Sequence, residues 1–266
     1  MPSFIIGLRT VHNMKYFVDE GSIVRQIWGK GDTILFIFAG SSAEFALNKA
    51  VDWLYYTGRL PADPLGRLFS TVSYARGIVF SENEAALQVI DKIGHIHKAV
   101  ETSRGAEIPD WSYRDVLFML IDYSIRSFEL LERKLTRKEK EDVFEVFNRM
   151  GLRMGIKDLP LNFKEWQVMR QAHLEHDLLK STFTVDLYRQ YRKHLGPFRY
   201  MVLKQVQVML VPAAVRKLLE LGSTPYLLPI LGLYKLTRIV KLDQILRNTM
   251  LPKAYKAQVQ DLDAGK

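Results

Sequence analysis

Apolar residues recur every three or four positions along most of the chain, the spacing that places them on one face of an α-helix. Prolines separate these periodic runs, as expected of a residue that interrupts helices. The pattern predicts helices over residues 22–28, 42–57, 64–80, 82–103, 111–133, 137–154, 163–180, 185–195, 198–220 and 236–249. Three of them begin with a capping-box signature: Ser41 and Glu44, Thr136 and Glu139, Asn162 and Glu165.

One segment has a different pattern. TILFIFAG (33–40) is dense in β-branched and aromatic residues, which is typical of a strand, but no second alternating run is present to pair with it. We therefore predict an all-α fold. The chain has 266 residues, 48% of them hydrophobic, and can bury a substantial core. Short loops favour one compact multi-helix domain, 1–198, with a helical extension, 199–266, packed on it.

The net charge of +9 is concentrated near the C-terminus. Residues 199–256 hold ten Lys and Arg against two acids, so +8 of the charge lies there. Basic residues alternate with apolar ones, a pattern that suits an acidic partner such as an anionic membrane surface. A solvated flank of amphipathic helices accounts for the pattern equally well. Nucleic acid is disfavoured because the segment has no recognition motif.

The chain contains no cysteine, which excludes disulfides, thiolate catalysis and cysteine-ligated metals. It has no nucleotide-binding loop and no hydrolase-triad motif. The N-terminus does not resemble a secretory signal, and no uncharged run reaches the ~20 residues of a membrane-spanning helix. We therefore expect a cytoplasmic protein, with peripheral membrane association as an option.

Two of the six histidines stand one residue apart in GHIHKAV (94–100). On a helix, residues i and i+2 point about 200° apart, so His95 and His97 cannot chelate one ion. Position 97 lies on the apolar stripe of Ile93 and Val100, whereas position 95 lies on the polar side. His97 is therefore predicted to face inward, as a core histidine satisfied by one hydrogen bond or as a ligand.

A second stripe, on the predicted helix 64–80, contains Arg67, Thr71 and Tyr74. A cation one turn from a hydroxyl, beside apolar residues, suits a carboxylate or propionate at the mouth of an apolar pocket. Pairing with Asp63, four residues earlier, would also account for Arg67.

Four segments resemble the latex-clearing protein and MpaB-type oxygenase family in order and spacing. They are SIVRQIWG (22–29), ADPLGRLFSTVSYARGIVF (62–80), IDKIGHIHKAV (90–100) and LIDYSIRSFELLERKLTRKEKEDVFEVFNRMGLRMGI (120–156). Characterised members of that family are all-helical, globin-related proteins that carry haem b. Some use O₂ to cleave a carbon–carbon double bond in a polyisoprenoid or prenyl chain.

The resemblance implies that His97 is the proximal ligand of a haem iron, and that Arg67 and Thr71 belong to the family's Arg-x-x-x-Thr motif beside the haem. It further implies a haem-b-dependent oxygenase that acts with O₂ on a hydrophobic isoprenoid or lipid-like substrate. The distal base is not identified. Glu44 and Asp52 are candidates because they lie on the predicted helix that precedes the motif.

The chain also departs from the family pattern. Ser70 stands where latex-clearing proteins can have a lysine, and Leu47 and Leu117 stand where relatives have histidines. These departures keep an alternative open: a non-catalytic helical lipid-binding or membrane-surface protein of the same fold.

HLEHD (173–177) places His173 and His176 three residues apart with Asp177 nearby, a spacing compatible with a divalent metal. The mixed polar character of this helix face favours exposed surface residues instead.

Overall fold

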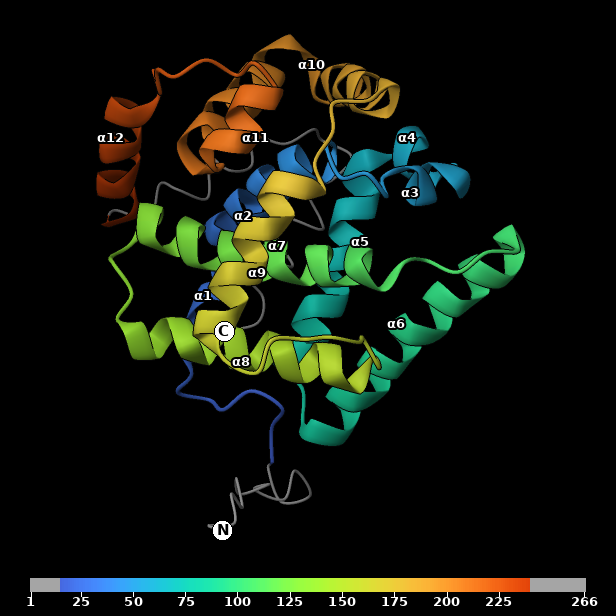
Figure 1. Cartoon of the computed structure of the whole chain (residues 1–266). Coiled ribbons are helices and arrows are strands. Elements are labelled where there is room, and N and C mark those ends of the chain that lie inside the picture. Colours follow the sequence, from blue (N-terminus) through green and yellow to red (C-terminus); the bar gives the residue numbers. More distant parts are fainter. Residues whose placement is uncertain (1–14, 240–266) are drawn as a thin grey trace.

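The computed structural model describes residues 15–239, which form helices joined by short connections (Figure 1). The first half contains α1 (Ile23–Trp28), α2 (Gly31–Phe45), α3 (Asp52–Tyr56), α4 (Arg59–Ala62), α5 (Pro64–Val79) and α6 (Asn83–Arg104). The second half contains α7 (Asp110–Leu131), α8 (Arg137–Arg153), α9 (Phe163–His176), α10 (Thr182–Leu210), α11 (Ala213–Leu218) and α12 (Leu228–Ile239). No strand occurs between residues 15 and 239, which confirms the all-α prediction.

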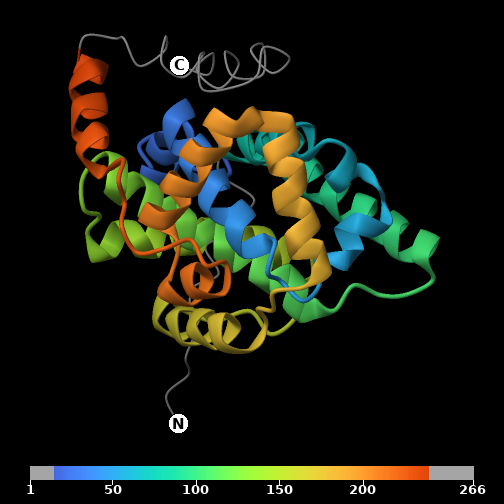
Figure 2. The same cartoon turned by 90° about the horizontal axis from the view of Figure 1, so that it is seen from above.

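The pairing of α2 with α7 is the most extensive helix contact of the fold, and the other helices surround this pair (Figures 1 and 2). α8 packs on α7, α10 on α2, and α5 on α6. Close approach of the central helices depends on Gly40, because a Cβ atom there would lie 2.3 Å from the ring of Tyr123. The fully buried Ile37 and Ile121 belong to the same core.

The apolar segment 33–40 lies within α2, so its strand-like composition has another cause. Ile34, Ile37, Phe38 and Ala39 are all buried, which means that α2 is covered on nearly every side. A helix without a solvent face shows a continuous apolar run and not a stripe. The predicted helix 42–57 is also wrong: α2 begins earlier, ends at Phe45, and is followed by a turn before α3.

The three capping predictions have different outcomes. Thr136 and Glu139 form the full capping box at the start of α8. Asn162 caps α9, but the carboxylate of Glu165 accepts from the backbone N–H of Leu161 and from the Asn162 amide. Ser41 lies inside α2, so the box predicted there is wrong.

The C-terminal helices follow the predicted pattern in outline. α10 bends above α2 at Gly196, which has φ +76°, and continues through Pro197 (Figure 2). The predicted helix 198–220 is thus divided between α10 and α11, and most of the predicted helix 236–249 lies outside the described residues. Val206, Val208 and Leu210 of α10 join the central core. Within the described residues, no helix combines the length and apolar character needed to cross a membrane.

Substitution of Gly40 tests the contact between α2 and α7. Gly40→Ala is expected to lower the free energy of unfolding by roughly 1–3 kcal/mol, because the new methyl group overlaps the Tyr123 ring. Gly94→Ala in α6 is the matched control: no atom lies within 4 Å of its Cβ position, so it should stabilise the chain by roughly 0.5–1 kcal/mol. Urea unfolding of both variants measures the difference. Equal effects would contradict the proposed close packing.

Candidate functional site

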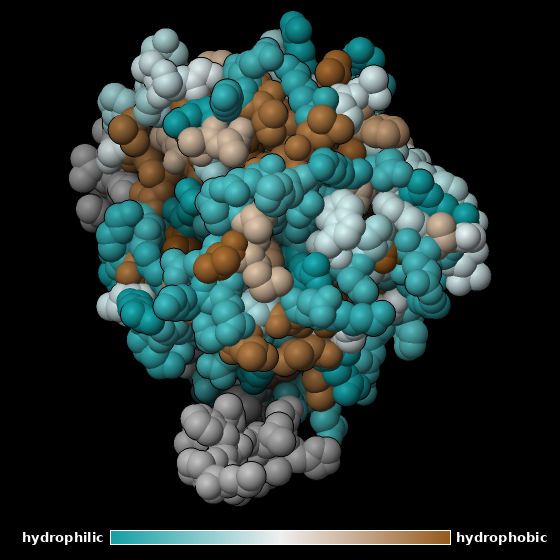
Figure 3. Space-filling model, in the orientation of Figure 1, coloured by the Kyte–Doolittle hydropathy of each residue, from teal (hydrophilic) through white to brown (hydrophobic). Residues whose placement is uncertain are grey.

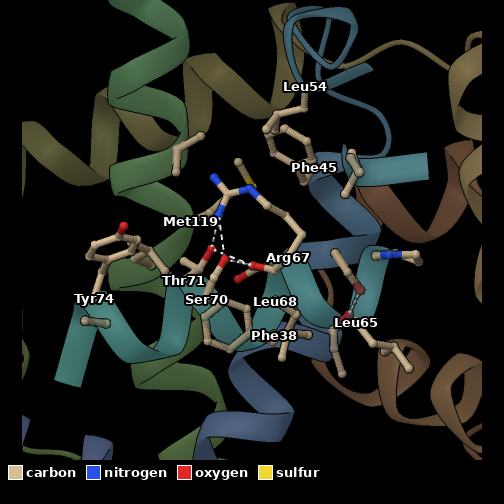
Figure 4. Close-up of a pocket in the computed structure, with 18 of the residues that line it drawn as sticks. Phe38, Phe45, Leu54, Leu65, Arg67, Leu68, Ser70, Thr71, Tyr74 and Met119 are labelled. Carbon is tan, nitrogen blue, oxygen red and sulfur yellow. Dashed lines mark hydrogen bonds between the residues drawn. The ribbon is translucent and has the colours of Figure 1, made fainter. Parts of the chain in front are cut away.

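A large apolar cavity lies between α2, α5, α6, α7 and α10, with a volume of about 1820 Å³. Small-molecule sites typically occupy roughly 300–1,000 Å³, so this space exceeds what one small ligand needs. Figure 4 shows Phe38, Phe45 and Met119 around the side chain of Arg67. The cavity can therefore hold a bulky apolar ligand, or two ligands side by side.

α5 positions the polar pair Arg67 and Thr71 in this apolar wall. The helix starts there because Asp63 accepts a hydrogen bond from the Gly66 N–H and Pro64 occupies the first turn, where its missing N–H is not needed. Arg67 Nη1 donates to Thr71 Oγ1 at 2.8 Å, and Thr71 Oγ1 donates to the Arg67 carbonyl at 3.1 Å (Figure 4). The two side chains thus act as one unit on a single helix face.

Arg67 has no carboxylate partner within the described part of the chain. Asp63 caps the helix and does not pair with it, so the ion-pair explanation of Arg67 fails. Burial lowers the pKa of Arg67, and the nearby cation Arg59 lowers it further. A half-buried guanidinium without a counter-ion favours an anionic ligand, because such a ligand would replace the lost hydration.

His97 lies on α6 and lines the same cavity, whereas His95 is exposed. The predicted orientation of the two histidines is therefore confirmed. Burial, and after it the charge of Arg67, lowers the pKa of His97 to about 4. The imidazole is neutral at physiological pH, which is the form that coordinates metals. Its Nδ1 atom is buried and has no hydrogen-bond partner among the described residues.

The structure brings Arg67, Thr71 and His97 together on one cavity, but it does not bring the candidate distal residues there. Neither Glu44 nor Asp52 lines the cavity. Asp52 pairs with Arg104 at 2.7 Å, and Glu44 is fully buried elsewhere. Glu44 lies on α2 and faces Arg170 and His173 of α9. A short turn after Phe45 interrupts the predicted helix 42–57, so Asp52 lies on the separate helix α3.

Glu44 instead belongs to a buried charge network with Arg170. Arg170 donates to both carboxylate oxygens of Glu44 and to Asp122 Oδ2 at 2.9 Å, while the Tyr123 hydroxyl donates to Glu44 at 2.8 Å. Burial by itself raises the pKa of Glu44, but Arg170 and then His173 outweigh it and lower the pKa to about 2. The network is therefore ionised and joins α2, α7 and α9.

His173 extends this network and is buried, so the prediction of a surface residue is wrong for it. Its Nε2 lies 2.8 Å from Glu44 Oε1, and its Nδ1 lies 2.8 Å from Asp115 Oδ1 and 3.6 Å from Asp177 Oδ2. Burial lowers the pKa of His173, but Asp115 and Glu44 outweigh it and raise the pKa to about 9. His176, in contrast, is exposed.

Sequence reasoning missed Arg170 and Asp122 as site-forming residues. A signal was present: Asp115 and Asp122 are seven residues apart on α7, and Arg170 and His173 are three apart on α9. Both spacings place the pair on one helix face. Opposite charges on the inner faces of two helices indicate a buried network only once the helices are known to be neighbours.

Replacement of Arg170 tests the network. Arg170→Met removes the cation that contacts both oxygens of the buried Glu44, and one of the two cationic partners of Asp122, so the free energy of unfolding should fall by roughly 3–5 kcal/mol. The control, Arg137→Ala, removes an exposed i,i+4 pair with Glu141 and should leave the urea unfolding midpoint nearly unchanged. Similar midpoints for both variants would contradict the role assigned to Arg170.

Comparison with known proteins identifies one relationship. A family model described as "ER-bound oxygenase mpaB/B'/Rubber oxygenase, catalytic domain" matches residues 28–239. No curated protein matches the chain. No solved structure matches it either. The matched range contains the cavity with Arg67, Thr71 and His97, and also the buried charge network.

Proposed function

Because the chain belongs to the family of mpaB/B′ and rubber oxygenase catalytic domains, we propose that it is a haem-b-dependent oxygenase that uses O₂ on a hydrophobic isoprenoid or lipid-like substrate. Membership in this family supports oxygenase chemistry. The haem and the substrate class are the parts that the proposal adds.

The observation that carries the haem proposal is the surroundings of His97. Its imidazole is neutral, lines a large apolar cavity, and has a buried nitrogen without a hydrogen-bond partner. Neutral imidazole is a common axial ligand of haem iron, and a chain without cysteine offers no thiolate in its place. The residues present therefore fit the group, with His97 as its proximal ligand.

Arg67 and Thr71 would hold the polar edge of the porphyrin. A haem has two propionate groups, and Arg67 is a cation in the cavity wall that pairs with no carboxylate of residues 15–239. Thr71 fixes the guanidinium through the 2.8 Å hydrogen bond, so that fewer rotamers are lost when an anion binds. The charge of Arg67 also keeps His97 neutral by disfavouring its protonated form.

The protein's other contribution is a dry, shaped cavity. When bound, haem iron supplies the binding and activation of O₂, and the chain supplies orientation and exclusion of water. Phe38, Phe45 and Met119 provide an apolar wall that favours a hydrocarbon chain over water. The space beyond that of a typical single ligand leaves room for a substrate beside the cofactor.

An absorption spectrum tests the cofactor. Protein expressed with a haem precursor should show a Soret band and a pyridine haemochrome of haem b, and His97→Ala should lose most of both. His95→Ala, two residues away and exposed, is the matched control and should keep the full haem content. A colourless wild-type protein, or an undiminished spectrum in His97→Ala, would contradict the proposal.

The second candidate function is a non-catalytic lipid-binding or membrane-surface protein of the same fold. Large apolar side chains are exposed on α10 and around the start of α12, and Figure 3 shows hydrophobic surface in this upper part of the molecule. We name this set the apolar rim: Phe198, Met201, Tyr226, Leu228 and Ile230. Ile230 also lines the cavity, as do Leu227 and Arg199. An anionic bilayer suits such a rim because apolar and cationic groups occur together.

Vesicle flotation tests this candidate. The double variant Leu228→Ser and Ile230→Ser should bind vesicles of phosphatidylcholine and phosphatidylserine at least about tenfold more weakly than wild type, because two exposed apolar anchors are lost. The control carries Leu161→Ser and Val168→Ser, which are more exposed than Leu228 and Ile230 but lie beside and on α9. Equal binding of the two variants would rule out the apolar rim. Vesicle binding without haem would favour the non-catalytic function.

A further inference from the structure

A second cluster of metal-binding side chains lies outside the cavity, between α7 and α9. It consists of Asp115 on α7, His173 on α9, and Asp177 at the C-terminal cap of α9. One donor atom from each residue lies within 4.8 Å of the other two. None of the three side chains lines the apolar cavity. The exposed His176 takes no part. The metal site suggested by HLEHD therefore loses His176 and gains Asp115, which tertiary packing brings to it from α7.

The buried ring nitrogen of His173 is the observation that points to a ligand. Asp115 Oδ1 lies only 2.8 Å from Nδ1, yet Nδ1 has no hydrogen-bond partner, so the oxygen is off the direction in which this nitrogen donates. Asp177 Oδ2, at 3.6 Å, does not satisfy it either. The side chain of His173 is only 2% exposed, so bulk water does not compensate.

The groups behind the cluster hold two of its members in the orientation that a metal needs. Glu44 Oε1 lies 2.8 Å from Nε2 of His173, so Nε2 can keep its proton. A cation at Nδ1 would displace the Nδ1 proton to solvent and take the lone pair that this leaves toward the carboxylates. This carboxylate–histidine arrangement is the usual support of a metal-binding imidazole. Asn48 Nδ2 donates to Asp115 Oδ2 at 2.9 Å, which leaves Oδ1 toward His173.

Asp177 adds a second carboxylate to the cluster and connects the cluster to solvent. Its only ion-pair contact within the described residues is the long one to His173. Its side chain is 29% exposed, so an ion can reach the cluster from solvent.

We propose that Asp115, His173 and Asp177 bind one divalent cation, which links α7 to the end of α9. One imidazole and two carboxylates form a mixed nitrogen and oxygen ligand set of the kind that holds Zn²⁺. Ligand atoms about 2 Å from one tetrahedral ion lie roughly 3.3 Å apart. The distances from His173 Nδ1 are 2.8 Å to Asp115 Oδ1 and 3.6 Å to Asp177 Oδ2, so small side-chain rotations complete the site. The proposal does not depend on haem, because none of the three ligands lines the cavity.

Zinc titration of the full-length protein tests the site. After removal of adventitious metal with a chelator, isothermal titration calorimetry should show one Zn²⁺ per chain, and metal analysis after desalting should give the same stoichiometry. Asp177→Asn should weaken binding at least about tenfold. Asp177 is partly exposed, so this variant should fold even where His173→Gln does not.

Two neighbouring substitutions serve as controls. Glu175→Gln and His176→Ala remove an exposed carboxylate and an exposed imidazole from the same helix end and should leave zinc affinity unchanged. Absence of stoichiometric zinc binding, or wild-type affinity in Asp177→Asn, would overturn the proposal and leave His173 as a protonated bridge between Glu44 and Asp115. Loss of binding in His176→Ala would overturn it as well, because it would assign the zinc to the surface.

Discussion

The fold depends on the ionised network in which Arg170 holds the carboxylates of Glu44 and Asp122. Glu44 and Arg170 are almost completely removed from water, and removal of one charge from water costs several kcal/mol unless partners replace its hydration. Here each charge has more than one partner, and the three residues come from α2, α7 and α9. The network therefore fixes the mutual position of these helices more strictly than apolar packing would, since a small slip would leave a buried charge unpaired.

α2 connects this network to the cavity. Glu44 joins the charges, whereas Phe38 and Phe45 of the same helix line the apolar space. Asn48, in the turn that follows, holds Asp115 and also lines the cavity, so it forms a second connection between the two regions. Because α2 is rigidly held through Glu44 and by the contact of Gly40 with Tyr123, the cavity wall that it provides is fixed in place before any ligand binds.

The buried Arg170 and the half-buried Arg67 show how the surroundings of a charged side chain decide whether it stabilises the fold or can bind a ligand. Burial lowers the pKa of Arg170, but its carboxylate partners Glu44 and Asp122 outweigh burial and raise it. Because its guanidinium is already paired with these carboxylates, it does not attract an anionic ligand. The guanidinium of Arg67 donates to the hydroxyls of Ser70 and Thr71, and burial lowers its pKa. An unpaired cation in an apolar wall is a costly arrangement for stability alone, and such arrangements are characteristic of binding sites. The same contrast applies to His173, whose imidazole is cationic at physiological pH, and His97, whose imidazole is neutral.

Much of this protein was determined by local sequence. The period of three to four residues predicted the all-α fold, and the capping box at Thr136 located the start of α8. The apolar stripe of α6 predicted that His97 faces inward and His95 faces outward. These features could be predicted because they depend only on helix geometry. The positions of Glu44, Arg170 and His173 were decided by the tertiary structure alone. A charged residue in a mixed helix face carries the same local signal whether it faces solvent or a neighbouring helix. The burial of α2 on nearly every side likewise removed the stripe that would have revealed it as a helix, since periodicity in a sequence reflects contact with water on one side only.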